Sequence, residues 1–222
     1  SPPRPRAVRW MCPRTTLRII KLEPSQRRQG RWLAHLEDGS ILRMGENEVV
    51  AFSLYTGMEL DDDTLSRLND SARRSQLKSK ALNMAAARPL SKKELTDKLL
   101  RKDAPPEDAA QTADWLEELG LINDRDYAAA VVRHYSAKGF GEKKIRDELY
   151  RRGVPREHWE DALAELDDPA DTLDRLVQAR LKGQEPTREA LKKVSDYLAR
   201  RGFRWQDISS ALRRCGGEPE DD

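Results

Sequence analysis

The feature that most constrains the fold of this chain is a pattern of apolar residues that occurs three times, with a period of about fifty residues. Within each copy the apolar positions are separated by helical intervals, so the pattern predicts a helical unit used three times in succession. The matched positions are Leu95, Leu99, Asp103, Ala109 and Ala113 in the first copy, Ile145, Leu149, Gly153, Trp159 and Leu163 in the second, and Val194, Leu198, Gly202, Ile208 and Leu212 in the third.

Each copy has room for three helices, and the start signals agree with this division. Ser91 and Glu94 form a capping box, and Asp168 precedes Pro169 at the start of another helix. Because three such helices bury only a modest core, each unit should pack on its neighbours. We therefore expect a mainly α fold of three tandem three-helix repeats in an elongated, curved stack. The leading helices are expected at 76–88, 124–138 and 169–183, the middle helices at 91–102, 141–152 and 187–201, and the trailing helices at 106–119, 156–166 and 204–215.

The region before the repeats predicts a small β-element that contains a hairpin. The pair Asp38-Gly39 lies between two apolar runs, which is a strong hairpin signal because type I′ turns need positive φ at both central residues. Three strands alone are marginally stable, so we expect helices to cover one face. The strands are expected at 17–22, 31–36 and 41–44, and the covering helices at 46–55 and 61–74.

Composition agrees with several small helical units rather than one deep core, since 36% of the residues are charged and 37% are hydrophobic. The formal net charge is only +2, so bulk charge does not by itself point to nucleic acid. The predicted organisation is a disordered basic segment at 1–14, a small α+β region at 15–75, helical repeats at 76–122, 123–167 and 168–216, and an acidic tail at 217–222.

The sequence also predicts the environment of the protein. No apolar run approaches the ~18–20 residues of a membrane span, and the first residues lack the apolar core of a signal peptide. Cys12 and Cys215 stand near opposite ends, so two free thiols in a reducing compartment are favoured over a disulfide. We therefore expect a cytoplasmic protein without membrane contact, and an elongated monomer.

The residues offer no recognisable catalytic site. There is no P-loop, dinucleotide-binding glycine motif, zinc-protease motif or nucleophile elbow. His35, His134 and His158 lie in three different predicted segments, and the pairs of acids stand at helix starts, where capping explains them. We therefore expect a protein that is not an enzyme and that needs no cofactor and no metal.

The middle helices carry cations at three matched positions in every copy, and two interpretations are open. Two of the positions fall in the last helical turn, where Lys and Arg stabilise the helix dipole by about 0.3–1 kcal/mol. Alternatively, a stack of repeats lines up these cations to bind a phosphate backbone or an acidic protein surface. The candidate partner-binding residues are Lys93, Lys143 and Lys192 at the first position, Arg101, Arg151 and Arg200 at the second, Lys102, Arg152 and Arg201 at the third, and Lys144.

Three stretches of the chain resemble the RecX family. Residues 138–154 read Lys-Gly-Phe-Gly-x-x-Lys-Ile-x-x-x-Leu-x-x-Arg-Gly-Val, which resembles the central signature of that family. Residues 119–128, which read Leu-Gly-Leu-Ile-Asn-Asp-x-x-Tyr-Ala, are also similar. Residues 197–208 read Tyr-Leu-Ala-Arg-Arg-Gly-Phe-x-x-x-x-Ile and resemble the C-terminal signature. The resemblance spans 76–215, and its specificity comes from the order, spacing and threefold repetition of these stretches.

The resemblance implies a regulator of the RecA recombinase that has no catalysis of its own. Members bind in the helical groove of the RecA–DNA filament and inhibit ATP hydrolysis, strand exchange and coprotease activity, so the implied partners are the filament and single- or double-stranded DNA in or beside it. This chain departs from the family at Asp103, where the first unit should end in glycine, and in its β region, which shorter members lack. The residues carried over are the basic positions of the matched stretches, Lys144, Arg151, Arg152, Arg200 and Arg201.

Two other functions remain open. Three-helix units can act like helix-turn-helix modules, with one helix in the major groove, which would make the chain a direct DNA-binding protein. No helix carries a clear cluster of Arg, Asn and Gln suited to reading bases. The chain could also be a scaffold for an acidic protein partner. Sequence-specific duplex binding without RecA would favour the first, and failure to bind RecA with helicity retained would favour the second.

Overall fold

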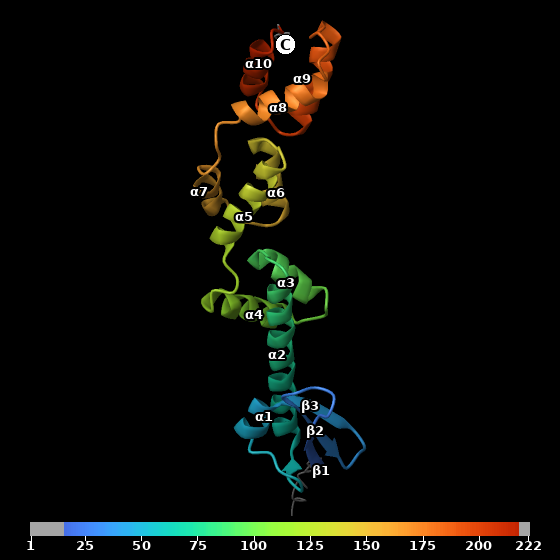
Figure 1. The fold of residues 1–222 in the computed structure, drawn as a ribbon. Coiled ribbons are helices and arrows are strands. Elements are labelled where there is room, and N and C mark those ends of the chain that lie inside the picture. Colours follow the sequence, from blue (N-terminus) through green and yellow to red (C-terminus); the bar gives the residue numbers. More distant parts are fainter. Residues whose placement is uncertain (1–15, 218–222) are drawn as a thin grey trace, which may run out of the picture. The chain divides into compact units, whose positions relative to one another are not determined.

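The computed structural model describes residues 16–217, which divide into a compact unit ending at Leu82 and a second unit beginning at Asn83 (Figure 1). The mainly α fold with a small antiparallel β region is the one predicted. The predicted basic segment 1–14, with Cys12, and the acidic residues 218–222 lie outside the described residues.

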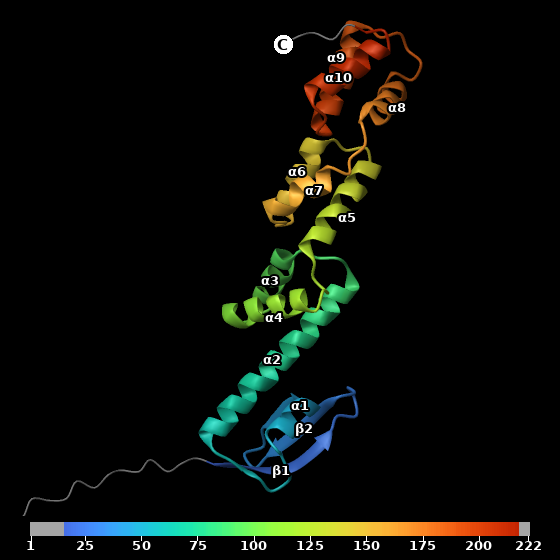
Figure 2. The same ribbon diagram turned by 90° about the vertical axis from the view of Figure 1, so that its left-hand side faces the viewer.

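The N-terminal unit is built on an antiparallel sheet with the strand order β3-β2-β1-β4. The predicted hairpin between the second and third strands is confirmed. Its turn is not the expected type I′, because Gly39 adopts φ +86° but Asp38 does not have positive φ. A short helix follows the third strand, and the first half of a long helix lies beside the sheet (Figure 2). The elements are β1 (Leu17–Pro24), β2 (Arg31–Leu36), β3 (Ile41–Gly45), α1 (Glu46–Ala51), β4 (Glu59–Leu60) and α2 (Asp62–Ala87).

The core of this unit lies between one face of the sheet and α2. Ile19, Leu36 and Met44 come from the strands, and Leu68 and Ala72 are one helical turn apart on α2. A buried carboxylate also joins the helices, because Glu48 of α1 accepts hydrogen bonds from the Ser71 and Ser75 hydroxyls of α2. The helical cover expected for the sheet is therefore present.

Helix α2 corrects one prediction. Separate helices were expected at 61–74 and 76–88, but a single helix runs from Asp62 to Ala87. No glycine or proline stands between these residues, so nothing in the chain breaks the hydrogen-bond ladder. The predicted division between residues 75 and 76 therefore falls inside a continuous helix.

The C-terminal unit is helical throughout, and its helices lie close to the predicted leading, middle and trailing positions. Cores form within the second and third copies: Ile145, Leu149 and Trp159 belong to one cluster, and Leu198 and Ile208 to another. The predicted capping box is confirmed, since the Ser91 Oγ accepts from the Glu94 N–H at 3.0 Å and the Ser91 N–H donates to Glu94 Oε2 at 3.0 Å. The helices are α3 (Lys92–Leu100), α4 (Pro106–Glu118), α5 (Asp124–Ala137), α6 (Glu142–Arg151), the 3₁₀ turn η1 (Arg156–His158), α7 (Trp159–Leu163), α8 (Ala170–Leu181), α9 (Arg188–Arg200) and α10 (Trp205–Arg214).

Candidate functional site

The middle helices of the second and third repeats, α6 and α9, meet end to end. The backbone N–H of Gly141, at the start of α6, donates to the carbonyl of Arg201 at 2.8 Å, and the N–H of Lys143 donates to the carbonyl of Gly202 at 3.1 Å. The first N–H groups and the last C=O groups of a helix have no partner within it. The junction pairs two N–H groups at the start of α6 with two C=O groups at the end of α9 and places the helix dipoles head to tail.

The same junction occurs one repeat earlier, between α3 and α6. The Ser91 hydroxyl, which caps the start of α3, donates to the carbonyl of Arg152 at the end of α6 at 2.5 Å. The side chain of Lys93 lies against Gly153. Since Ser91 and Gly141 are matched positions in the repeat, the contact between repeats is itself repeated. Junctions α3–α6 and α6–α9 are called the stacked junctions below.

Each stacked junction needs glycine at its end. Gly153 and Gly202 have φ of +70° and +90°, and a Cβ on either would overlap the side chain of Lys93 or the backbone of Lys144, respectively. The first repeat has Asp103 at this position, also at positive φ (+61°). Within residues 16–217 no middle helix precedes α3. Aspartate also tolerates this conformation better than most residues. The departure from the family pattern at Asp103 therefore has a structural reason.

The cations at the first two matched positions of the middle helices are exposed in all three repeats. Lys93 Nζ lies 2.7 Å from Asp97 Oδ2, and Arg151 lies 2.7 Å from the Glu148 carboxylate, so these two are partly neutralised. The others have no carboxylate partner within residues 16–217. This set of exposed cations is called the basic rows below, and its members are Lys93, Lys143 and Lys192 in one row and Arg101, Arg151 and Arg200 in the other.

The third matched position behaves differently, because two of its three cations are used inside the protein. Arg152 donates to the hydroxyls of Tyr127 at 2.8 Å and Tyr135 at 3.2 Å, and it also contacts Glu148. The Tyr127 hydroxyl in turn donates to Glu94 Oε2 of the first repeat at 2.9 Å. Arg152 therefore belongs to a network that joins the first two repeats, whereas Lys102 is exposed.

Hydrogen bonds within this network favour the charged forms of Glu148 and Arg152. Burial by itself would raise the pKa of Glu148, but hydrogen bonds from Arg151, Tyr135 and Arg152 lower it below its ordinary value of 4.5. Burial opposes the charge of Arg152, yet its hydrogen bonds with Tyr127 and Tyr135 raise the pKa of this guanidinium. Glu148 is therefore a buried carboxylate held ionised by two arginines.

Arg201 is the second internal cation. Its Nε donates to the carbonyl of Gly139 at 2.8 Å, and its guanidinium lies 4.2 Å from the centre of the Phe140 ring. It therefore fastens the end of α9 to the end of α5. Lys144 is half-buried, with its backbone against Gly202. The sequence prediction treated the three cation positions as equivalent. The aromatic residues Tyr135 and Phe140, which contact Arg152 and Arg201, were the signal that could have distinguished the third position from the first two.

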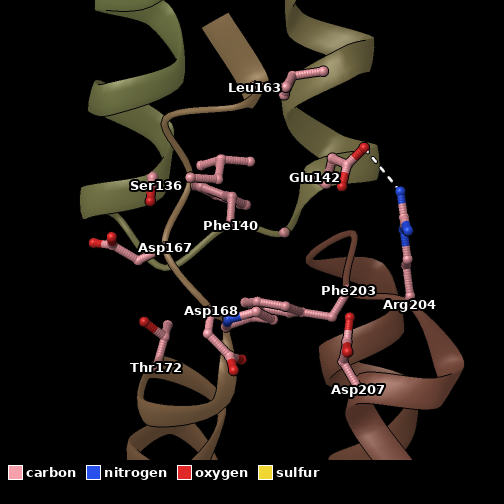
Figure 3. Close-up of a pocket in the computed structure, with 13 residues that line it drawn as sticks. Ser136, Phe140, Glu142, Leu163, Asp167, Asp168, Thr172, Phe203, Arg204 and Asp207 are labelled. Carbon is pink, nitrogen blue, oxygen red and sulfur yellow. Dashed lines mark hydrogen bonds and ion pairs between the residues drawn. The ribbon is translucent and has the colours of Figure 1, made fainter. Parts of the chain in front are cut away.

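A cavity of about 390 Å³ lies between the second and third repeats (Figure 3). Phe140 and Phe203 face it, and Asp168 and Asp207 stand at its rim together with the ion pair Glu142–Arg204 at 2.9 Å. Its lining contains carboxylates and the Ser136 hydroxyl, and no histidine, lysine or cysteine. Elsewhere in the described part of the chain, no group of three or more His, Cys, Asp or Glu residues could hold a metal ion. Among residues 16–217, no helix combines the length and apolar character that a membrane crossing needs.

Comparison with known proteins places the repeats in one family. Residues 78–116 match the family model described as "RecX, first three-helix domain", and residues 123–163 match "RecX, second three-helix domain". Two solved structures share the fold. One, a regulatory protein RecX, has a TM-score of 0.71 and 24% identity and covers 90% of this chain and 98% of its own. RecX from Lactobacillus salivarius has a TM-score of 0.60 and 25% identity, over 64% of this chain and 96% of its own.

Several curated relatives carry the name regulatory protein RecX. That of Streptococcus gordonii is 28% identical over 208 residues, which are 92% of this chain and 79% of the relative. That of Xanthomonas axonopodis pv. citri is 37% identical over 136 residues, which are 60% of this chain and 84% of the relative. That of Clostridioides difficile is 25% identical over 88% of this chain and 94% of the relative. This agreement confirms the resemblance seen in the signatures, and the chain belongs to the RecX family of regulatory proteins.

Proposed function

We propose that this protein is a non-enzymatic negative regulator of the RecA recombinase, which binds in the groove of the RecA–DNA filament and inhibits its ATPase, strand-exchange and coprotease activities. The observation that carries the proposal is the pair of basic rows. Arg101, Arg151 and Arg200 are exposed at the same position of three successive repeats. The stacked junctions join those repeats through the hydrogen bond from the Ser91 hydroxyl to Arg152, the backbone hydrogen bonds between α6 and α9, and packed glycines.

A repeated surface of this kind suits a repeated partner. A filament presents the same acidic groups or phosphates at regular intervals, and each repeat of the regulator can make one set of contacts. Each contact alone is weak, since exposed ion pairs contribute about 0.2–1 kcal/mol. Because the repeats are on one chain, the first contact raises the effective concentration of the next.

The structure narrows the residues that can be tested. Arg152 and Arg201 are engaged within the protein, so changing them would alter the contacts between repeats as well as any partner contact. We therefore assign the filament contact to the basic rows and Lys102, with Lys144 at their edge. The test variant carries Arg101→Gln, Lys143→Gln and Arg200→Gln, one from each repeat, none with a carboxylate partner within residues 16–217.

The first measurement is DNA-dependent ATP hydrolysis by RecA with increasing amounts of the wild-type protein. Inhibition well below one molecule per RecA protomer is expected if the protein acts on the filament. The triple variant should need about 3- to 100-fold more protein for half inhibition, since it loses three contacts of about 0.2–1 kcal/mol each.

The matched control carries Arg125→Gln, Arg133→Gln and Arg175→Gln, which remove three exposed cations from the leading helices α5 and α8. Its inhibition should equal that of the wild type. Equal inhibition by the test and control variants would show that the basic rows are not the contact. No inhibition by the wild type, together with sequence-specific duplex binding in the absence of RecA, would instead favour a DNA-binding protein built from helix-turn-helix-like units.

A further inference from the structure

The sheet of the N-terminal unit has an outer face that the core does not use. In the pairing of β1 with β2, Lys21 lies opposite His35 and Glu23 lies opposite Leu33. In the pairing of β2 with β3, Leu33 lies opposite Arg43. Successive residues of a strand point to opposite faces, so these side chains share the face away from the core.

A bulge in β1 moves Lys21 onto this outer face. Ile19 and Lys21 are two residues apart and would share one face of a regular strand. The register shifts between them, with Ile19 opposite Leu36 and Lys21 opposite His35. The extra residue, Ile20, therefore allows Ile19 to enter the core while Lys21 turns outward.

A groove of about 580 Å³ runs over this face and the β1–β2 loop. The loop closes with a hydrogen bond from the Ser25 N–H to the Arg31 carbonyl at 2.7 Å, which brings its arginines beside the strands. Leu33 and Ile41 provide the apolar part of the lining. The cations that line the groove, called the groove cations below, are Lys21, Arg27, Arg28, Arg31 and Arg43.

The groove carries an excess of positive charge. Glu23 is its only acidic lining residue in the described chain, and it is held by Lys21 Nζ at 2.6 Å and His35 Nε2 at 3.0 Å. The hydrogen bond with Lys21 lowers the pKa of Glu23, so this carboxylate stays ionised and neutralises Lys21 rather than the arginines. The four arginines of the groove have no carboxylate partner within residues 16–217.

Several cations of the same unit outside the groove are paired. Arg67 lies 3.4 Å from Asp63, and Arg18 lies 2.8 Å from Glu59. The uncompensated arginines thus gather along one concave strip, where their fields add and attract an anionic polymer. Arginine binds phosphate oxygens through two parallel N–H donors.

We propose that this groove binds the sugar–phosphate backbone of single-stranded nucleic acid. The arginines would contact successive phosphates, and the apolar side chains of Leu33 and Ile41 would lie against unstacked bases, which a duplex does not expose. The site is separate from the basic rows, and it does not depend on RecA.

The test uses the full chain and a fluorescein-labelled deoxythymidine oligomer, with binding followed by fluorescence anisotropy over a series of salt concentrations. The variant Arg28→Gln with Arg43→Gln should bind more weakly than the wild type. Its plot of log affinity against log salt should be shallower by about 1.4, because each lost phosphate contact removes about 0.7 from the slope for a single strand.

The matched control is Arg74→Gln with Lys80→Gln, which removes two exposed cations of α2 that do not line the groove. It should keep the affinity and the salt slope of the wild type, and circular dichroism should show the same fold for all three proteins. Photo-crosslinking of a 4-thiothymidine oligomer to the wild type should label peptides within residues 21–43.

Three outcomes would overturn the proposal. The groove variant could bind the oligomer with the affinity and salt slope of the control, which would make an acidic protein surface the better occupant. Crosslinks could fall only in the helical repeats. A duplex could also compete as well as the single strand at equal phosphate concentration, which would remove the preference for a single strand.

Discussion

At the scale of single residues, two features of the structure require glycine at position 202. Gly202 has positive φ, and it lies against the backbone of Lys144. We expect Gly202→Ala to lower the free energy of unfolding by about 1–2 kcal/mol for the left-handed backbone. Overlap of the new Cβ with the neighbouring helix should add about 1–3 kcal/mol. Urea denaturation of the full chain measures the sum.

Gly183 supplies the control for this prediction. It also has positive φ (+74°), but a Cβ there would meet open space. Gly183→Ala should therefore show only the backbone penalty of about 1–2 kcal/mol. Equal losses for the two variants would mean that the close approach at the junction contributes nothing to stability.

Arg152 and Arg151 allow the internal network to be tested with one shared partner. Both contact Glu148, but the Arg152 side chain is 24% exposed and that of Arg151 is 70% exposed. We expect Arg152→Met to lower the free energy of unfolding by about 1–3 kcal/mol, since it removes the hydrogen bonds to the Tyr127 and Tyr135 hydroxyls and one of the two arginines that contact the buried Glu148. Arg151→Met should change it by about 0–1 kcal/mol. A loss for Arg151→Met as large as that for Arg152→Met would contradict the assignment of Arg152 to the interior.

Glu148 should also make stability depend on pH. Its pKa in the folded protein lies below the ordinary value of 4.5, so its contribution is present above about pH 4.5 and is lost as the pH falls through the folded value. The urea midpoint of the wild type should therefore fall more between pH 7 and pH 3 than that of Glu148→Gln. Parallel curves for the two proteins would show that Glu148 gains no stabilising charge contact on folding.

At the scale of elements, each stacked junction packs the end of one middle helix against the start of the middle helix of the preceding repeat. Gly141 has an ordinary φ, but a Cβ there would overlap the backbone of Gly202. We expect Gly141→Ala to break the hydrogen bond from Lys143 to Gly202 while helix α6 itself stays formed. Hydrogen exchange of the Lys143 amide should become faster, with the amides of α3 unchanged as the internal control. Unchanged protection of Lys143 would show that the junction adapts to the methyl group.

At the scale of the whole molecule, the basic rows and the groove cations are proposed to act on different partners. The groove variant should lose affinity for the oligomer, and the triple variant of the basic rows should lose inhibition of RecA. When all five substitutions are combined, each assay should show the loss of its own variant and no more, because the two sets of residues are proposed to bind different partners. A further loss in either assay would mean that both surfaces bind one ligand.

The sequence by itself determined the helical class, the threefold repeat, the hairpin and the family. These follow from local chemistry: the spacing of Leu95 and Leu99 marks a buried helical face, and Asp38-Gly39 selects a tight turn. Burial at such positions confirms the pattern. Lys143 and Arg200 are exposed, as binding residues must be, and the site along the middle helices stays a prediction.

The tertiary structure alone decided which cations are free to contact a partner and which, like Arg152 and Arg201, are engaged within the protein. It also showed that α2 continues through the predicted break between residues 75 and 76. Arg151 and Arg152 are neighbours in the sequence, but the hydroxyls of Tyr127 and Tyr135, twenty-five and seventeen positions away, make the second an internal residue. The Lys21 side chain reaches the outer face through a bulge that no periodicity predicts. A long polar side chain can satisfy its charge with any partner within reach, so its role depends on contacts between distant segments, which local sequence patterns do not encode.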